Sequence, residues 1–111
     1  MEYTLNVPGL PRAKQRPRFT RNGGVYTPAE TKKAEDNIAE LYDGPLFEGP
    51  VEVECVFDKE QTTIIIREHD EERSKLRGDL DNYIKLVLDG LNKSGAWNDD
   101  KQVHSINGMK Q

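Results

Sequence analysis

The segment from Leu80 to Leu91 constrains the fold of this sequence more than any other part of it. Its apolar residues recur at three- and four-residue spacings, which places them on one face of a helix. These residues are Leu80, Tyr83, Ile84, Val87, Leu88 and Leu91. Because Lys93 and Gly95 follow the pattern, we expect the helix to end there. The sequence therefore predicts one long amphipathic helix.

Alternation of apolar and polar residues predicts strands elsewhere in the chain. It occurs in "YTLNVPG" at 3–9 and in "VEVECVF" at 51–57, and "TTIIIR" at 62–67 is a further candidate strand. Cys55 falls on the apolar side of the second pattern, so we expect a buried structural thiol there rather than a nucleophile. A last strand is expected over residues 102–107, after a turn.

A first helix is indicated by "TPAE" at 27–30, which fits a capping box with Thr27 as the N-cap and Pro28 at the first helical position. Gly44 marks its end. The order of elements predicts a small α+β (α/β-like) fold, in which a mixed sheet packs with two helices. With 111 residues the chain has room for one core, so we expect a single domain over 1–111.

Composition excludes several classes of protein. Cys55 is the only cysteine, which rules out intramolecular disulfides and cysteine-rich zinc sites. No signal-like N-terminus and no apolar run of membrane-spanning length occurs, so we expect a cytoplasmic protein with no membrane partner. The Gly23–Gly24 pair lacks the spacing of a phosphate cradle, and no organic cofactor is expected.

Charge is distributed unevenly along the chain. The formal net charge is −4, yet no Asp or Glu occurs between Tyr3 and Ala29. The bases of this segment are Arg12, Lys14, Arg16, Arg18 and Arg21. Its prolines and its glycine pair predict an extended basic loop with a turn near Asn22. Such a loop is either simply solvated or a local patch that binds phosphate.

"DLDNYIK" at 79–85 has two interpretations. In the first, Asp79 caps the helix, Asp81 lies near the positive helix end, and Asp81 pairs with Lys85 on the surface. In the second, the two carboxylates bind a metal ion. That requires Asp79 to lie outside the helix on extended backbone, because residues two apart within a helix point to nearly opposite sides.

A second acidic pair, Asp99 and Asp100, follows the helix in "WNDD". If a strand returned this pair to the helix start, three carboxylates would meet and would need a hard cation such as Mg²⁺ or Mn²⁺. A cation beside a basic loop suggests phosphodiester hydrolysis. Lys85 could then reach a phosphate as charge develops on it.

These motifs resemble a known family. "GDLDNYIKLVLDGLN" followed by "AWNDDKQV", together with the basic "PRAKQRPRFTRNGGVYTP", is similar to RusA-type Holliday junction resolvases, which are crossover junction endodeoxyribonucleases. The resemblance implies a homodimer that uses Mg²⁺, with Mn²⁺ as a substitute, to nick two opposed strands of a four-way DNA junction in recombination and repair.

The resemblance also implies roles for individual residues. Asp79, Asp81 and Asp100 would be catalytic metal ligands, Lys85 would be the catalytic lysine, and Asp99 would cap a turn or support the ligands. The DNA contacts would be Arg12, Lys14, Arg16, Arg18, Arg21 and Arg77.

Two other functions stay open on the sequence. One is a metal-dependent nuclease with looser choice of branched DNA, and the other is a non-catalytic nucleic-acid-binding module whose acids are helix caps. The resemblance further implies a final strand beyond "NGMKQ", where this sequence stops. The expectation is therefore a RusA-like domain that lacks this C-terminal strand.

Overall fold

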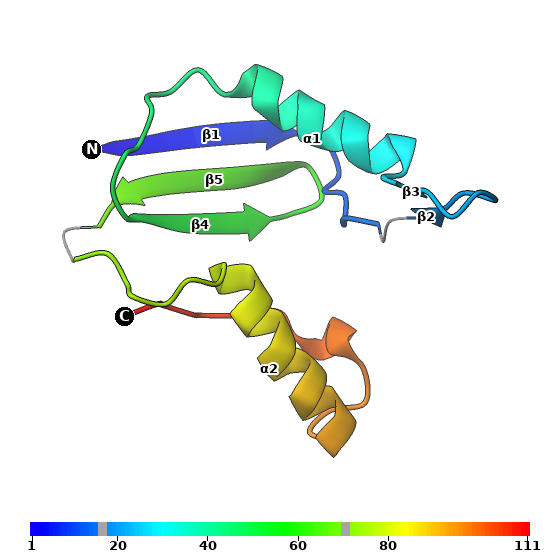
Figure 1. Ribbon diagram of the computed structural model, residues 1–111. Coiled ribbons are helices and arrows are strands. Elements are labelled where there is room, and N and C mark those ends of the chain that lie inside the picture. The colour runs from blue at the N-terminus through cyan, green and yellow to red at the C-terminus, as the bar shows by residue number, and fades with distance from the viewer. Residues whose placement is uncertain (16–17, 70–71) are drawn as a thin grey trace. The chain divides into compact units, whose positions relative to one another are not determined.

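The computed structural model describes residues 1–15, 18–69 and 72–111. Figure 1 shows its elements, which in chain order are β1 (Glu2–Pro8), β2 (Arg18–Phe19), β3 (Val25–Tyr26), α1 (Ala29–Leu41), β4 (Val51–Phe57), β5 (Gln61–Glu68), α2 (Leu80–Ser94) and the 3-10 helix η1 (Asp100–Gln102). The chain divides into two compact units, the sheet unit Met1–Glu71 and the helix unit Glu72–Gln111. The α+β class is confirmed, and the single domain stays a prediction.

The main sheet has three strands in the order β1-β5-β4, and both of its pairings are antiparallel. Two of these strands, β1 and β4, were expected from their alternation, β5 was a further candidate strand, and all three are confirmed. The expected mixed sheet is wrong for the described strands, because β5 pairs antiparallel with both of its neighbours. The short connection between β4 and β5 can join only antiparallel strands. Ile64 lies at the centre of the sheet, opposite Leu5 on one side and Cys55 on the other.

The core of the sheet unit lies between β1 and α1, which runs along β1 in Figure 1. Leu5 is buried there, and the rings of Tyr3 and Tyr42 meet edge to face with centroids 4.9 Å apart. Cys55 is exposed, which corrects the expected burial, because every residue of the edge strand β4 is exposed. Partial desolvation of its sulfur, with help from the Glu54 charge, still raises the pKa of the thiol.

The start of α1 does not form the expected capping box. The N-cap is Pro28 rather than Thr27, and no side chain caps the helix. A residue that precedes proline is driven toward extended backbone, and Pro28 itself has the extended ψ of 143°, so the helix begins one residue later. Thr31 is buried, and its hydroxyl accepts a hydrogen bond from the Gln15 N–H at 3.1 Å. That bond ties the basic segment to α1.

The helix unit is built on α2, which is confirmed with the expected boundaries. Asp79 is its N-cap, and Gly95 ends it in the left-handed conformation at φ 81°. The side chains of Leu80, Ile84 and Leu88, which recur every four residues, are half-buried along one side. None of the helices within the described ranges has the length and apolarity needed to cross a membrane.

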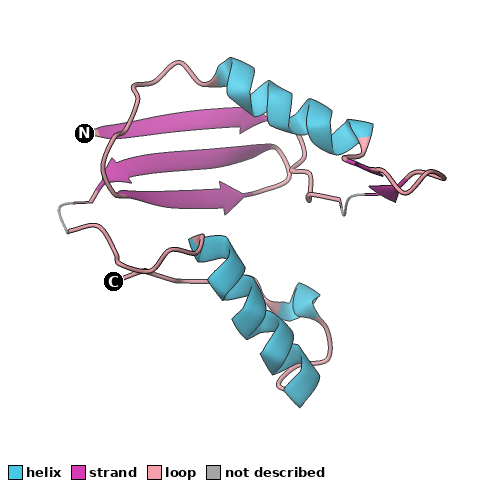
Figure 2. Cartoon of the chain, viewed as in Figure 1, coloured by secondary structure: helices cyan, strands magenta, loops and turns pink. Residues whose placement is uncertain are grey.

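The expected strand at 102–107 is wrong. Residues 100–102 form η1, and residues 103–111, all of them described, contain no strand (Figure 2). This segment instead packs beside the start of α2. A side chain at Gly108 would lie 2.8 Å from Ile84, and the Lys110 ammonium donates to the Gly78 carbonyl at 3.1 Å. A strand needs a partner to pair with, and here the chain binds a helix start instead.

Candidate functional site

The start of α2 holds two acidic side chains that do not cap the helix. Asp79 has extended backbone, with φ −73° and ψ 140°, and its side chain makes no capping hydrogen bond. Its backbone carbonyl accepts from the N–H groups of Asn82 at 3.1 Å and Tyr83 at 3.3 Å. Asp81 lies in the first turn, and both carboxylates are exposed. This is the backbone arrangement that the metal-binding interpretation requires, and it leaves both carboxylates available to a ligand.

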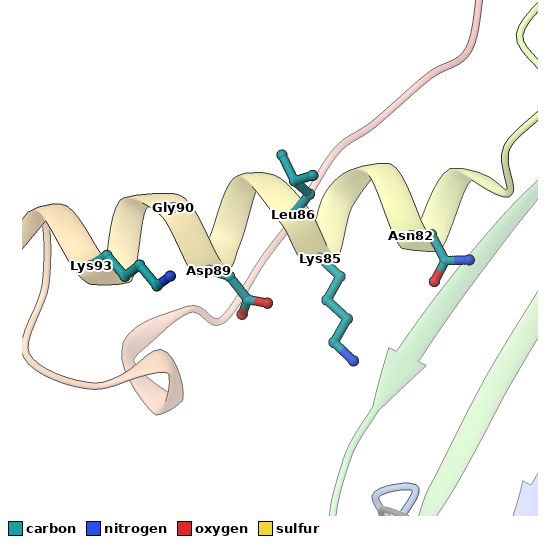
Figure 3. Close-up of a pocket in the computed structure, with 6 residues that line it drawn as sticks. All are labelled: Asn82, Lys85, Leu86, Asp89, Gly90 and Lys93. Carbon is teal, nitrogen blue, oxygen red and sulfur yellow. The ribbon is translucent and has the colours of Figure 1, made fainter.

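Lys85 lies one turn beyond Asp81 on the same side of α2. It is exposed, and the ion pairs among described residues do not include one between Lys85 and Asp81. Figure 3 shows Asn82, Lys85 and Asp89 extending to one side of the helix, with Leu86 extending to another. The expected surface pair is therefore not formed, and the ammonium is free to approach an anion.

These side chains border a shallow hollow of about 420 Å³ along α2. The lining residues are Asn82, Lys85, Leu86, Asp89, Gly90 and Lys93. They recur at three- and four-residue steps, on the side of the helix opposite Leu80, Ile84 and Leu88. The hollow is open, and Lys85, Lys93 and Asp89 give it two ammonium groups and one carboxylate.

The second acidic pair forms a closed turn after α2. Asp99 caps η1, because its carboxylate accepts from the Lys101 N–H at 2.8 Å, as expected. The Gln102 side chain completes a capping box by accepting from the N–H groups of Asn98 and Asp99 at 2.7 and 3.0 Å. The Asp-x-x-Gln spacing is the sequence signal from which this box could have been predicted.

Asp100 is exposed and is held by one neighbour. The Trp97 indole N–H donates to its Oδ1 at 2.8 Å. The Trp97 ring itself is half-buried. The hydrogen bond was missed, because no spacing rule connects an indole to an acid three residues later.

The three candidate metal ligands do not converge in this chain. Across residues 1–15, 18–69 and 72–111, no group of three His, Cys, Asp or Glu side chains is placed to hold a metal ion. A helix of 15 residues is about 22 Å long, and Asp100 follows its C-terminal end. The chain reaches the helix start only later, at Gly108 and Lys110. The ligand roles of Asp79, Asp81 and Asp100 stay predictions.

The basic segment lies in the sheet unit. Arg12 and Arg21 are exposed, and Lys14 makes a loose, exposed ion pair with Glu35 of α1 at 3.7 Å. The expected turn is confirmed as a hairpin between β2 and β3, in which Gly23 has φ 81°. Because this conformation is strained for residues with a side chain, it explains the glycine.

The other three candidate DNA contacts differ in how far the structure describes them. Arg16 lies outside the described residues. Arg18 belongs to β2 by its backbone, where it pairs with Tyr26, and its side chain is outside the description. Arg77 is exposed in the helix unit, two residues before Asp79. The structure thus places one candidate base next to the acidic helix start.

The chain is similar to a known family over nearly its whole length. The family model described as endodeoxyribonuclease RusA matches residues 8–111. That range contains all five bases of the basic segment, both α-helices and the turn that carries Asp100. No curated protein and no solved structure matches the chain.

Proposed function

Because the chain belongs to the RusA family of endodeoxyribonucleases, which are Holliday junction resolvases, we propose that it resolves four-way DNA junctions by paired, symmetric nicks that depend on Mg²⁺. The observation that carries the proposal is the start of α2. There the Asp79 carboxylate makes no capping bond, exposed Asp81 lies within one turn of it, and exposed Lys85 lies one turn beyond Asp81. We expect the enzyme to act in the cytoplasm during recombination and repair.

The donor atoms at this helix start fit a hard divalent cation. Magnesium in proteins usually binds one or two carboxylates and completes its shell with water and substrate phosphate oxygens. Asp79 and Asp81 are such donors, and we assign the ion to them, with Mn²⁺ able to replace Mg²⁺. Asp100 is the proposed third ligand, and it can take this role only where its turn, or the same turn of a second copy, reaches the start of α2. The chemistry that such an ion supplies when bound is activation of water and stabilisation of the leaving oxygen.

Lys85 acts on the phosphate itself in this proposal. Its ammonium is exposed and is not paired with Asp81. A lysine is a compact point charge on a flexible stem. Placed beside the scissile phosphate, it stabilises the negative charge that grows on the phosphate oxygens in the transition state.

The basic segment supplies affinity for the DNA backbone. Arg12 and Arg21 are exposed, and the Lys14–Glu35 pair at 3.7 Å is exposed on both sides. An exposed pair of this kind is worth at most about 1 kcal/mol, so Lys14 can exchange Glu35 for a phosphate. With Arg16, Arg18 and Arg77, these residues are proposed to contact phosphates and to carry no sequence information.

The need for two symmetric nicks favours a homodimer. Two nicks at symmetric positions need two identical sites that are related by a twofold axis. We therefore propose that two copies of the chain bind one junction and that each copy cuts one strand.

A synthetic immobile junction tests the proposal. Strand-labelled junctions are incubated with the protein, with and without Mg²⁺, and both cut positions are mapped. Symmetric nicks that require the metal are expected on the junction, and little cutting is expected on matched linear or flapped DNA. Equal cutting of all three substrates would indicate a less specific branched-DNA nuclease. Junction binding without nicking in Mg²⁺ or Mn²⁺ would indicate a non-catalytic binding module.

A further inference from the structure

Gly78, the residue directly before the N-cap Asp79, is held at both of its backbone groups. Its N–H donates to the Tyr83 hydroxyl at 3.1 Å, and its carbonyl accepts from the Lys110 ammonium at 3.1 Å. The backbone groups that a helix start leaves without partners belong to the N-cap and to the residues after it. Capping of α2 therefore does not account for the two bonds to Gly78.

The Tyr83 ring also lies close against the backbone of Gly78. A side chain built at this glycine would lie 2.8 Å from the ring and from its hydroxyl, so that one of the two would have to move. Gly78 is not among the described glycines with positive φ. The glycine is therefore explained by the close approach of the ring rather than by its backbone conformation.

Lys110 is held in place by its neighbours in the chain. A side chain at Gly108 would lie 2.8 Å from a side chain of α2, and the Gln111 carbonyl accepts from the Ser74 hydroxyl at 3.0 Å. Lys110 is half-buried, and the ion pairs among described residues do not include one between Lys110 and Asp79. The ammonium binds the backbone carbonyl and leaves the carboxylate available to an ion.

We propose that Lys110 and Tyr83 are positioning residues for Asp79, because they hold the residue from which the chain enters the helix start. The Gly78 carbonyl and the Asp79 nitrogen belong to one planar peptide group, so Lys110 fixes the direction of the chain at Asp79. The carbonyl of Asp79 is already bound by N–H groups of α2. Its backbone is thus fixed on both sides, and only the rotation of its side chain remains free.

This inference rests on the proposed function, since Asp79 is a metal ligand only there. Groups that hold a metal ligand in place from outside contribute about 10- to 100-fold to metal affinity or activity. A displacement of the ligand by about 1 Å is enough for an effect of that size. The two bonds to Gly78 should therefore affect metal binding as well as stability.

Three substitutions and one control separate positioning from a purely structural role. Lys110→Met keeps the apolar stem and removes the donor, whereas Lys110→Arg keeps a cationic donor. Tyr83→Phe keeps the ring and removes the hydroxyl. Lys59→Met is the matched control, because it removes the same charge from an exposed position of the sheet unit.

The readouts are Mn²⁺ binding without DNA, followed by electron paramagnetic resonance, and the kcat and KM for junction nicking. Urea unfolding of each variant shows that it is folded under the assay conditions. We expect Lys110→Met and Tyr83→Phe to lose about 10-fold or more in Mn²⁺ affinity and in kcat, with the KM for the junction unchanged. Lys110→Arg should retain most of both, and Lys59→Met should stay within a factor of about two of the wild type.

The outcomes that overturn the inference differ from those that overturn the proposed function. If the wild type binds Mn²⁺ and nicks, and Lys110→Met and Tyr83→Phe match it in both or lose only stability, the two residues do not position Asp79. Equal losses of Mn²⁺ affinity in Lys110→Met and Lys59→Met would show an effect of total charge, and the inference would again be wrong. A wild-type protein that neither binds Mn²⁺ nor nicks overturns the proposed function, and this inference with it.

Discussion

At the residue scale, Asp79 shows how a familiar position can be used in an unfamiliar way. Aspartate is among the preferred N-cap residues because its side chain can accept from the first N–H groups of the helix. Here the backbone carbonyl of Asp79 accepts instead, and the side chain makes no capping bond. A carboxylate that is not needed for the helix is free for another use.

This suggests that activity and stability can be separated at the start of α2. We expect Asp79→Asn and Asp81→Asn each to reduce junction nicking by more than about 100-fold, the upper end of what an outer-shell partner contributes. Junction binding should persist, since these acids repel phosphate rather than attract it. Gel-shift and nicking assays on the same preparations measure both.

A matched control for these variants is Asp36→Asn, which removes the same charge from α1, an element of the sheet unit. It should leave nicking within a factor of about two of the wild type, as surface substitutions usually do. If Asp79→Asn and Asp81→Asn both nick as the wild type does, neither residue is a metal ligand.

Single residues in this chain were predictable to different extents. The capping role of Asp99 and the extended backbone of Asp79 follow from local rules, and both are confirmed. The contact between Trp97 and Asp100 was not predictable, because it depends on the path of the turn between them. Convergence of Asp100 with Asp79 depends on still longer-range structure, which local sequence does not specify.

At the element scale too, features that local sequence determines were predictable, and features that need a distant partner were not. Strand β4 and helix α2 have strong periodic patterns, and their boundaries match the expected ones closely. The prediction of a strand at 102–107 failed because a strand exists only where a partner edge is available. A capping box over residues 99–102 needs no distant partner, so the local 3-10 turn forms there instead.

Helix α2 carries a glycine that its own structure does not require. Gly90 lies in the helix interior, and a methyl group built on it would meet nothing within 4 Å. Glycine costs a helix interior about 0.8–1 kcal/mol relative to alanine. We therefore expect Gly90→Ala to raise the free energy of unfolding by about 0.5–1 kcal/mol in urea titrations.

Gly95→Ala is the matched control, since it makes the same chemical change at the left-handed C-cap with φ 81°. It should destabilise the protein by about 1 kcal/mol, because a side chain there is strained. If Gly90→Ala also destabilises the protein, another surface must approach the helix closely at that point.

A hydrogen bond between β1 and the segment after α1 makes stability depend on pH. The Tyr3 hydroxyl donates to the Asp43 carboxylate, and this bond raises the pKa of Tyr3 above its ordinary value. The folded state therefore favours the protonated phenol. Its contribution is fully present below the ordinary tyrosine pKa of about 10, and it is lost as the pH rises through the raised pKa.

We accordingly expect the wild type to be more stable than Tyr3→Phe by a constant margin from pH 7 to about 9.5, and by a shrinking margin above about pH 10. Urea unfolding of both proteins across this range measures the margin. Tyr83→Phe provides a tyrosine control in the helix unit. A margin that does not change with pH would show that the bond to Asp43 does not contribute.

At the scale of the whole molecule, charge is separated along the chain. The net charge is −4, yet the segment from Tyr3 to Ala29 contains bases and no acids between its ends. This separation of charge was predictable from the sequence. The structure adds that Gln15, in the middle of this segment, is tied to the buried Thr31 of α1, so the bases are attached to a fixed element.

Fixed positive charges on an acidic protein should bind DNA in a strongly salt-dependent way. Each phosphate contact contributes about 0.9 to the slope of log K against log salt concentration. We expect Arg12→Ala and Arg21→Ala each to weaken junction binding at all sequences and to lower this slope by about 0.9. Lys59→Ala, at an exposed position between β4 and β5, removes one positive charge outside the basic segment and should leave the slope unchanged. If all three variants lost junction affinity and salt slope equally, only the total charge of the protein would determine its binding to DNA. No loss for Arg12→Ala and Arg21→Ala would remove both residues from the DNA-binding surface.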